Sequence, residues 1–248
     1  MKVILQTHST METRSISQYA AISEGIEIIR QNYQGNLLKN LQSDLKEGAM
    51  PVGSVDFVKT AFELIGMEPP AFNAYDNCIR ETMWGRKIWQ TEVLDAFCSP
   101  PIFIKPIQLK RFNGFVYKGD EHDGYDEHDR EQLQILDSSF SPFDKVYVSE
   151  VMDFIAEWRC YITNGELIAI CRYDNNELDH DVDMAFVNEI VACVPERTIA
   201  VDIGKTKNGH FLVVELNDAW AIGKYQGINN KDYFDFLYTR WRQIIAES

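Results

Sequence analysis

Two acidic side chains and one amide, close together late in the chain, form a pattern that could bind a metal ion. Glu215 and Asn217 are two residues apart in VVELND, so they project from the same face of a strand. Asp202 ends the preceding apolar run, AVDIG, and the turn between the two runs allows it to lie across from them. Carboxylate and amide oxygens suit Mg²⁺, which completes its shell with water and phosphate oxygens. The pattern predicts a magnesium site, and the alternative is a polar hairpin face exposed to water.

A lysine near the end of an apolar run offers a second chemical group. Lys105 stands in PIFIKP, residues 101–106, which has the pattern of a short strand. Burial of an ammonium group is costly unless it meets an anion, and a nucleotide phosphate would serve. The alternative is a lysine at a strand edge whose charged end reaches water.

A third group of candidates surrounds an apolar linker that includes Met152. Glu150 ends one predicted strand, and Glu157 opens the next, seven residues later. An extended linker can offer backbone N–H and C=O groups to an adenine edge, while a carboxylate binds ribose hydroxyls. Arg159 shares a strand face with Glu157 and could bind a phosphate or a carboxylate through its planar fork. The alternative is a surface ion pair of Glu157 with Arg159 or Arg172.

The hydrophobic pattern predicts the elements that position these residues. Strands are expected at 3–6, 101–106, 145–151, 158–162, 167–173, 198–203 and 210–216, and helices at 55–65, 83–97, 182–193 and 232–246. A helix-biased stripe is expected around Ile22, Ile26, Ile28 and Ile29, and residues 107–145 are expected to be irregular. The hairpins favour antiparallel sheets, and therefore an α+β fold rather than a doubly wound one.

Taken together, these residues resemble the ATP-grasp superfamily. Four features follow its order: Lys-Pro after a strand, an acidic residue ending a later strand, a second Glu seven residues on, and Asp-(x)12-Glu-x-Asn. The order and spacing are similar to those of carboxylate–amine ligases of the D-alanine–D-alanine ligase and RimK type. The resemblance covers residues 80–248 and implies two α+β subdomains that clasp ATP, after a small α/β N-terminal lobe. The expected domains are a lobe at 1–75, a small subdomain at 76–148 and a large subdomain at 149–248.

The resemblance also implies a nucleotide site, made by Lys87, Lys105, Glu150, Met152 and Glu157. The two lysines would bind ATP phosphates, with Arg86 as the alternative to Lys87. The backbone around Glu150 and Met152 would frame the adenine, and Glu157 would bind the ribose.

The metal and catalytic roles follow from the same resemblance. Asp202, Glu215 and Asn217 would hold Mg²⁺, and the catalytic residues would be Lys105 and Arg159. Several ligases of the family carry an arginine two residues before the metal aspartate, where this chain has Ala200. Arg159 or Arg172 would then take its place near the acyl phosphate.

The implied activity is ATP-dependent joining of a carboxylate to an amine through an acyl phosphate, on an amino acid or peptide. The expected cofactors are ATP and Mg²⁺. Two alternatives stay open: a phosphotransferase on the same scaffold, and a non-catalytic nucleotide-binding or interaction module.

Composition excludes some partners. The 248 residues carry 24 Lys plus Arg against 38 Asp plus Glu, a formal charge of −14, which argues against nonspecific binding to nucleic acid or to an anionic membrane. The five cysteines form no C-x-x-C pair, which is typical of reduced thiols in a cytoplasmic protein. No apolar run is long enough to span a membrane.

An acidic loop, residues 120–131, contains a small repeat: Asp-Glu-His-Asp occurs at 120–123 and again at 126–129. The spacing of six between His122 and His128 fits no common zinc site. The loop is expected to be a solvated lid or a substrate-binding element.

Overall fold

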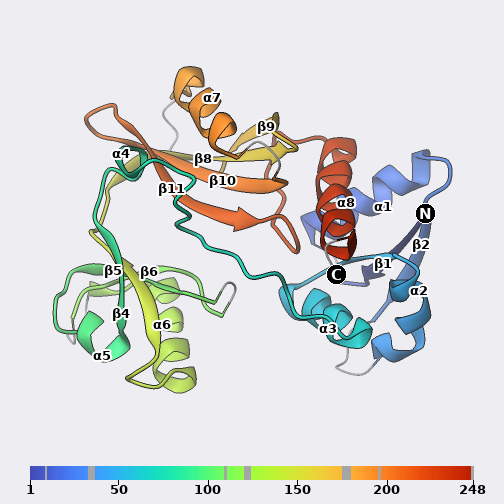
Figure 1. The fold of residues 1–248 in the computed structure, drawn as a ribbon, viewed down its shortest axis with the longest axis horizontal. Helices are drawn as coiled ribbons and strands as arrows, with labels where there is room; N and C mark the ends of the chain where they lie inside the picture. Colours follow the sequence, from blue (N-terminus) through green and yellow to red (C-terminus); the bar gives the residue numbers. More distant parts are fainter. Residues whose placement is uncertain are drawn as a thin grey trace. The chain divides into compact units, whose positions relative to one another are not determined.

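The computed structural model describes residues 1–8, 10–32, 37–108, 111–119, 124–174, 180–194 and 197–246. The chain divides into two compact units (Figure 1). Unit 1 contains Met1–Ala71, Glu157–Ile203 and Leu216–Ser248, and unit 2 contains Phe72–Ala156 and Gly204–Glu215. The predicted α+β class is confirmed, because antiparallel sheets and helices make up much of both units. The three-domain division stays a prediction.

Unit 1 begins with a small parallel sheet of order β2-β1-β3. The elements are β1 (Lys2–Gln6), α1 (Met11–Ile22), β2 (Glu27–Gln31), η1 (Leu37–Leu41), α2 (Gln42–Lys46), β3 (Met50–Val52) and α3 (Val55–Ile65). Thr10 caps α1, Ser54 caps α3, and Gly66 ends α3 in the left-handed conformation, as helix-end chemistry favours. The expected helical stripe is wrong beyond Ile22, since Ile28 and Ile29 belong to β2 and pair with β1.

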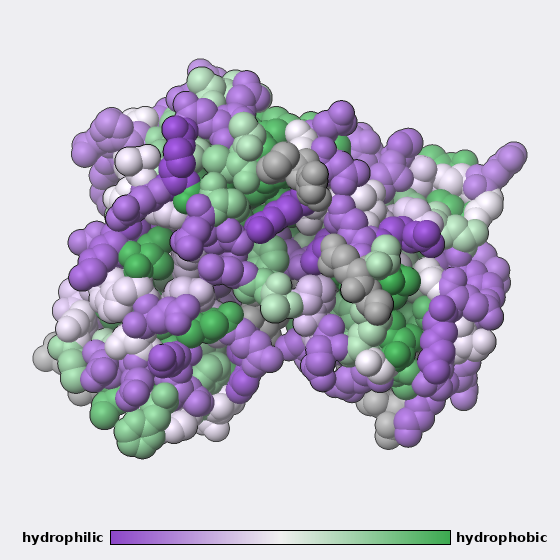
Figure 2. Space-filling view, viewed as in Figure 1, coloured by the Kyte–Doolittle hydropathy of each residue, from purple (hydrophilic) through white to green (hydrophobic). Residues whose placement is uncertain are grey.

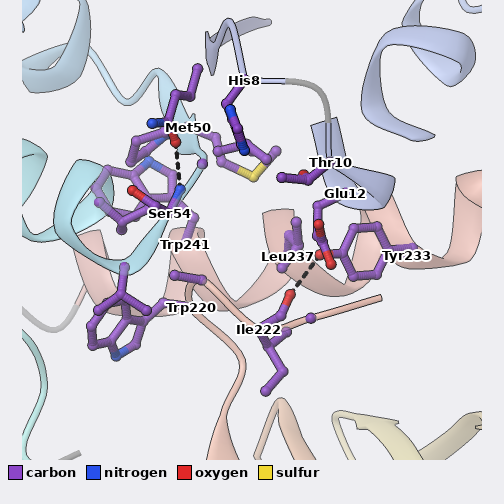
Figure 3. Close-up of a pocket in the computed structure, with 18 residues that line it drawn as sticks. His8, Thr10, Glu12, Met50, Ser54, Trp220, Ile222, Tyr233, Leu237 and Trp241 are labelled. Carbon is purple, nitrogen blue, oxygen red and sulfur yellow. Dashed lines mark hydrogen bonds between the residues drawn. The ribbon is translucent and has the colours of Figure 1, made fainter. Parts of the chain in front are cut away.

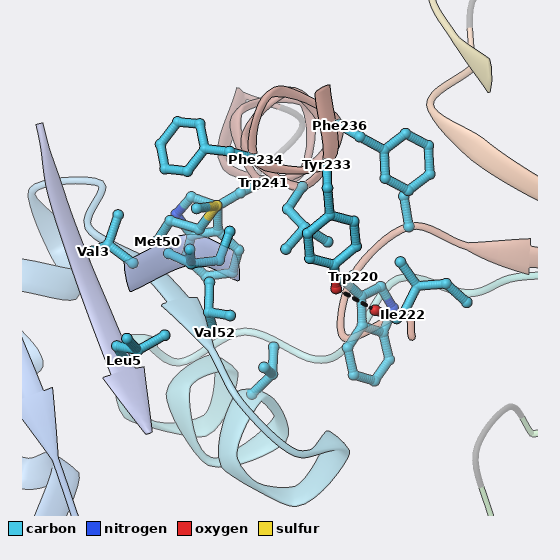
Figure 4. Close-up of a cluster of buried hydrophobic side chains, with 14 of the residues drawn as sticks. Val3, Leu5, Met50, Val52, Trp220, Ile222, Tyr233, Phe234, Phe236 and Trp241 are labelled. Carbon is cyan, nitrogen blue, oxygen red and sulfur yellow. Dashed lines mark hydrogen bonds between the residues drawn. The ribbon is translucent and has the colours of Figure 1, made fainter. Parts of the chain in front are cut away.

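The C-terminal helix α8 (Asn230–Ala246) belongs to the same unit and packs against α1. Figure 4 shows apolar side chains of α8, β1 and β3 converging in one core. Its buried members include Val3, Leu5, Met50, Phe234 and Trp241. The three central residues of β1 are all buried, so buried and exposed residues do not alternate along it. Both faces of this sheet are covered, as is usual for parallel sheets.

A second sheet, of order β11-β10-β8-β9, carries most of the predicted site residues. It is formed by β8 (Phe154–Thr163), β9 (Glu166–Arg172), β10 (Ile199–Thr206) and β11 (Phe211–Asp218), with α7 (Met184–Cys193) between β9 and β10. β8 and β9 form an antiparallel hairpin through Asn164 and Gly165, both at positive φ, which is the turn that an Asn-Gly pair favours. The boundary between the units passes through β10 and β11.

Unit 2 is built on an antiparallel sheet of order β4-β7-β5-β6. Its elements are α4 (Glu81–Trp84), β4 (Ile88–Glu92), α5 (Val93–Ala96), β5 (Ile102–Pro106), β6 (Phe115–Tyr117), α6 (Glu127–Ser139) and β7 (Lys145–Ser149). One face of the sheet buries Ile102, Ile104, Phe115, Val146 and Val148. Lys105 is adjacent in sequence to Ile104 and therefore lies on the other face.

Two predictions about unit 2 are wrong. The helix expected at 83–97 is α4, β4 and α5, because Gly85 ends the first helix in the left-handed conformation and the following residues pair with β7. The segment 107–145, expected to be irregular, contains β6 and α6. The second copy of the acidic repeat starts α6: Asp126 is the N-cap and accepts a hydrogen bond of 2.8 Å from the Asp129 N–H. The first copy, 120–123, lies outside the described residues.

The face drawn in Figure 2 is largely hydrophilic, with apolar side chains interspersed. Among the described residues, no helix has both the length and the apolar character needed to cross a bilayer.

Candidate functional site

A buried ion pair lies at the centre of the candidate site in unit 1. Arg159 on β8 and Asp202 on β10 are 7% and 3% exposed. The guanidinium donates from Nε to Oδ1 at 2.8 Å and from Nη2 to Oδ2 at 2.7 Å. Burial acts to lower the pKa of Arg159, but the charge and hydrogen bonds of Asp202 outweigh it and raise that pKa above its ordinary value. The arginine is therefore a permanent cation held in one orientation.

Asn217 joins this pair from β11. Its Nδ2 donates to Asp202 Oδ2 at 3.1 Å, so the structure brings together two of the three residues predicted to bind the metal. The expectation that Asp202 ends its strand is wrong, since β10 continues to Thr206. Asp202 is held instead between neighbouring strands of the sheet, where its carboxylate has little freedom to turn.

Arg159, rather than Arg172, contacts the predicted metal aspartate. Arg172 donates from Nε and Nη2 to Asp174, at 2.8 and 2.9 Å. Arg159 reaches Asp202 from β8, the strand next to β10 in the sheet. Its role in place of an arginine at position 200 stays a prediction. The predicted ion pair of Glu157 with either arginine is not among the described interactions.

Two tyrosines extend the cluster, and neither is among the residues expected from the sequence. The Arg159 guanidinium carbon lies 4.8 Å from the centre of the Tyr225 ring, which stacks on Tyr173 at 4.9 Å. Burial raises the pKa of Tyr173 well above its ordinary value, so it stays protonated at neutral pH. Tyrosines in strand and loop segments are common core residues, and nothing in the sequence distinguishes these two.

Glu157 on β8 is a half-buried carboxylate beside this cluster. Burial raises its pKa, a hydrogen bond with Tyr173 partly offsets the rise, and the negative charges of Asp202 and Asp174 add to it. Its own backbone N–H is bound by Asp174 Oδ2 at 2.9 Å. A partly desolvated carboxylate can accept hydrogen bonds from hydroxyl groups, such as those of a ribose.

Lys105 forms an ion pair with a carboxylate of unit 2. The lysine is 6% exposed, and Nζ forms a hydrogen-bonded ion pair with Oε2 of Glu215 on β11. The positive charge of Lys105, buried on the sheet face opposite the apolar core, is therefore balanced by Glu215. The sequence pattern predicts that the same carboxylate binds the metal. The alternative of a lysine whose charge reaches solvent is wrong.

Three other predicted residues, Lys87, Glu150 and Met152, lie in unit 2. Lys87 is exposed, and its Nζ lies 4.9 Å from the centre of the Trp89 ring. Its backbone is fixed by Glu150, whose Oε2 accepts the Lys87 N–H at 2.9 Å and whose N–H donates to the Lys87 carbonyl at 3.2 Å. Met152 is half-buried in the extended segment that follows.

Arg86, the alternative to Lys87, binds backbone carbonyls of unit 2. Its guanidinium donates to the carbonyls of Trp84, Val213 and Val214, at 3.1, 2.8 and 2.6 Å. The bonds to Val213 and Val214 hold the first part of β11 to the α4 segment. Arg86 thus links two segments of unit 2, and Lys87 is the exposed residue beside it.

The predicted metal donors fit Mg²⁺ in their chemistry, with two carboxylates and one amide oxygen. The described residues contain no group of three or more His, Cys, Asp or Glu side chains placed to hold a metal. Asp202 and Asn217 belong to unit 1 and Glu215 to unit 2, so the complete set stays a prediction. His128 is exposed on α6, and His122 lies outside the described residues.

Comparison with known proteins identifies a family for this chain. A family model described as "ATP-grasp domain, R2K clade family 2" matches residues 83–236, which is more than half of the chain. No curated protein sequence matches.

Solved structures with the same fold include D-alanine–D-alanine ligase from Bacillus anthracis, with a TM-score of 0.55 and 14% identity over 99% of this chain and 98% of that chain. The same ligase complexed with ATP gives a TM-score of 0.53 at the same identity and coverage. D-alanyl-alanine synthetase A from Vibrio cholerae gives 0.55 at 12% identity, over 100% of this chain and 99% of that chain. At such identities the similarity shows the fold alone.

Proposed function

Since the chain belongs to family 2 of the R2K clade of ATP-grasp domains, we propose that it is an ATP-dependent carboxylate–amine ligase. The substrate carboxylate would attack the γ-phosphorus of ATP, the bond to the β-phosphate oxygen would break, and ADP would leave. The amine would then attack the acyl carbon of the acyl phosphate, lose a proton and expel inorganic phosphate. The observation that carries this proposal is the Arg159–Asp202–Asn217 cluster, a fixed cation beside metal-type oxygen ligands.

The protein's part in this reaction is orientation and charge neutralisation. Arg159 would lie against the acyl phosphate, where a rigid guanidinium can pair with two oxygens at once. Lys105 and Lys87 would bind the phosphates, the Glu150–Met152 backbone would frame the adenine, and Glu157 would accept the ribose hydroxyls. Asp202, Glu215 and Asn217 would hold Mg²⁺, which supplies neutralisation of the charge on the transferring phosphoryl group.

From the Lys105–Glu215 ion pair we infer that both groups change partners when nucleotide binds. Without nucleotide, the ammonium and the carboxylate neutralise each other. Arriving phosphates would attract Lys105, and Glu215 would then be available to the cation that accompanies them. This exchange predicts that ATP and Mg²⁺ bind more tightly together than either does alone.

The test is a mass-spectrometric screen of amino acids and peptides with ATP and Mg²⁺. A ligase gives a product equal in mass to the acid plus the amine minus water, with one ADP and one phosphate for each product. Glu215→Gln, which keeps the shape of the side chain, is the matched control and should lose most of this turnover. A phosphorylated acceptor would identify a phosphotransferase instead, and ATP binding without turnover across the whole panel would identify a binding module.

A further inference from the structure

A small polar pocket of about 300 Å³ lies in unit 1, beside α1 and the carboxyl ends of β1 and β2. Its lining consists of residues 6–8 at the end of β1, four residues of α1 and Arg30 on β2, and every described lining side chain is polar. Two of them are arginines, Arg14 and Arg30, and none is acidic. In sheets with parallel strands, ligands commonly bind beyond the carboxyl ends of the strands. We name this site the Arg14–Arg30 pocket.

Local structure directs both arginines to this pocket. The lining residues of α1 are at positions 13, 14, 17 and 18, so they form two pairs four residues apart on one helix face. Arg14 is oriented by a hydrogen bond from its Nε to the Thr10 carbonyl oxygen, at 3.2 Å. Arg30 reaches α1 from β2, the edge strand of the sheet, where its Nη2 donates to Ser17 Oγ at 3.1 Å. Both guanidinium groups are therefore held by neutral acceptors.

The positive charge of this pocket is not neutralised locally. In the part of the chain that the structure describes, neither Arg14 nor Arg30 pairs with a carboxylate. A guanidinium group has several N–H donors, and the described bonds of each arginine use only one of them. The whole chain has 38 Asp plus Glu against 24 Lys plus Arg. A site with two arginines and no acidic lining residue is thus a local exception to the acidic character of the chain.

The acidic residue in the first turn of α1, Glu12, does not line this pocket. Its Oε1 accepts the backbone N–H of Lys224 at 2.9 Å. Figure 3 shows Glu12 beside Tyr233 and Leu237, in a neighbouring cavity of unit 1. The positive end of the α1 dipole adds to the potential of the two arginines. The pocket is therefore suited to an anion.

Two guanidinium groups match a phosphate monoester better than a carboxylate. A phosphate monoester carries a charge of about −1.5 to −2 at neutral pH and has three acceptor oxygens, whereas a carboxylate carries one charge on two oxygens. The planar fork of arginine also binds phosphate through two parallel hydrogen bonds. The polar lining favours a ligand whose remaining part is polar. The volume is at the lower end of the range for small-molecule sites, which is roughly 300–1,000 Å³.

We propose that the Arg14–Arg30 pocket binds a small phosphate monoester with a polar organic part. The two guanidinium groups pair with the phosphoryl oxygens, and the hydroxyl and amide groups around them bind the organic part. The proposal goes beyond the ligase activity, because no residue of this pocket is among those assigned to the nucleotide, the metal or catalysis.

The first test is calorimetry in a buffer of low ionic strength without phosphate, sulfate or nucleotide. Glycerol 3-phosphate and glucose 6-phosphate should each bind at least about tenfold more tightly than glycerol and glucose, and added salt should weaken the binding. Glycerate, which has a carboxylate in place of the phosphate, and inorganic phosphate, which lacks the organic part, should both bind more weakly than glycerol 3-phosphate.

Three outcomes of this test would overturn the proposal. One is the absence of binding of both sugar-type phosphates at millimolar concentration. The second is equal affinity for glycerol 3-phosphate and glycerate, which would show that the pocket does not select a phosphoryl group. The third is a serine-phosphorylated peptide that binds more tightly than either small ester, which would assign the pocket to a protein ligand.

Two variants test the assigned contacts. Arg14→Gln and Arg30→Gln should each weaken the binding of glycerol 3-phosphate by about tenfold, as expected for a lost charge-assisted hydrogen bond. Both side chains are exposed, so the fold should be retained, and thermal melts check this. Arg242→Gln on α8 is the matched control, since it removes the same charge at an exposed position outside the pocket. A similar loss in all three variants would show general electrostatic attraction and would refute the site.

A further variant separates this pocket from the proposed nucleotide site. Lys87 is an exposed residue of unit 2 that the proposed function assigns to ATP phosphates. Binding of glycerol 3-phosphate should be unchanged in Lys87→Gln. Binding that is lost there and kept in Arg14→Gln and Arg30→Gln would assign the probe to the nucleotide site and overturn the proposal. Binding that depends on the two arginines, in a protein without ATP turnover, would support the pocket and refute the ligase activity.

Discussion

At the residue scale, the geometry of Arg159 matters as much as its charge. Lysine in its place would keep the charge and lose the planar fork that bonds Asp202 twice. We expect Arg159→Lys to lower the free energy of unfolding by about 1–3 kcal/mol, the range for a lost hydrogen bond between charged groups, and to reduce turnover strongly. Urea unfolding measures the first effect and ADP release the second.

Arg172→Lys is the matched control on the neighbouring strand. Its pair with Asp174 is only partly buried, with 24% of the arginine side chain exposed. We expect a loss of less than about 1 kcal/mol and little change in turnover. Equal effects of the two substitutions would show that Arg159 is an ordinary ion-pair member.

A double-mutant cycle can separate two roles of Lys105, its ion pair with Glu215 and its proposed binding of ATP phosphates. Lys105→Met leaves Glu215 without its ammonium partner and should destabilise the protein, whereas adding Glu215→Gln should restore part of that loss. If Lys105 also binds phosphates, the single variant should weaken ATP binding by roughly 1–3 kcal/mol, and the second substitution should not restore it. Chemical unfolding and ATP titration report the two effects. Full ATP affinity in Lys105→Met would contradict the nucleotide role.

Glu157 should make stability depend on pH. Its raised pKa means that the folded protein holds this proton at a pH where the unfolded chain has already released it. Its contribution to stability therefore falls as the pH rises from the ordinary value of 4.5 through the raised value, and then stays level. Glu157→Gln, which does not titrate, should gain stability relative to the parent across that interval. Unfolding free energies measured from acidic to neutral pH give the comparison.

Glu166→Gln is the control for this pH dependence, because Glu166 is an exposed carboxylate on the same hairpin. It should change stability by no more than about 0.5 kcal/mol at any pH. Parallel curves for Glu157→Gln and the parent would show that Glu157 is well solvated, and unaltered ATP affinity in that variant would argue against a role at the ribose.

At the element scale, the end of β11 is anchored by the C-terminal helix. Asp218 is fully buried and accepts two bonds of 2.7 Å from Arg240 on α8, together with the Trp220 N–H at 3.3 Å. These bonds hold the residue next to Asn217 and fix the start of the segment that follows β11. Neither residue was singled out in the sequence, where Arg240 follows the pattern of an ordinary polar helix position.

Removing Arg240 from its ion pair with Asp218 should destabilise the protein. Arg240→Met leaves a buried carboxylate without its cation, and we expect a loss of about 3–5 kcal/mol in the free energy of unfolding. Lys231→Met on the same helix breaks the exposed pair with Asp235 and should change the free energy of unfolding far less, because water screens that pair. Chemical unfolding of the two variants tests the difference, and similar losses would mean that Asp218 is compensated by other groups.

At the scale of the whole molecule, nucleotide and metal should stabilise the fold together. A ligand present at about 100 times its dissociation constant adds about 2.7 kcal/mol, which raises the melting temperature of a chain of this size by several degrees. A non-hydrolysable ATP analogue with Mg²⁺ should give this rise, and either component alone should give less. Thermal melts of the parent and of Asp202→Asn measure it. Identical melting temperatures with and without the complete mixture, supported by calorimetry without heat of binding, would refute the nucleotide proposal.

The sequence by itself determined the α+β class, the strands around 102–106, 145–149 and 166–172, and the terminal helix. Each has a strong local signal, such as a run of β-branched residues, an Asn-Gly turn or a stripe of helical period. The sequence also predicted the acid, amide and lysine positions of the candidate site, because their order along the chain resembles one family, and those roles stay predictions. Local signals failed at 83–97, where the residues of β4 adopt a strand only because β7 is available to pair with them.

Tertiary structure alone decided which charges meet. The two residues of the Arg159–Asp202 pair are 43 positions apart, and those of the Lys105–Glu215 pair are 110 apart. No local pattern predicts such a pairing, since it depends on the order of strands in a sheet. The same reason explains why Arg159, and not Arg172, pairs with Asp202, and why Arg86 binds carbonyls of β11. Sequence spacing limits which groups share a strand face, but burial and strand order determine the partner of each group.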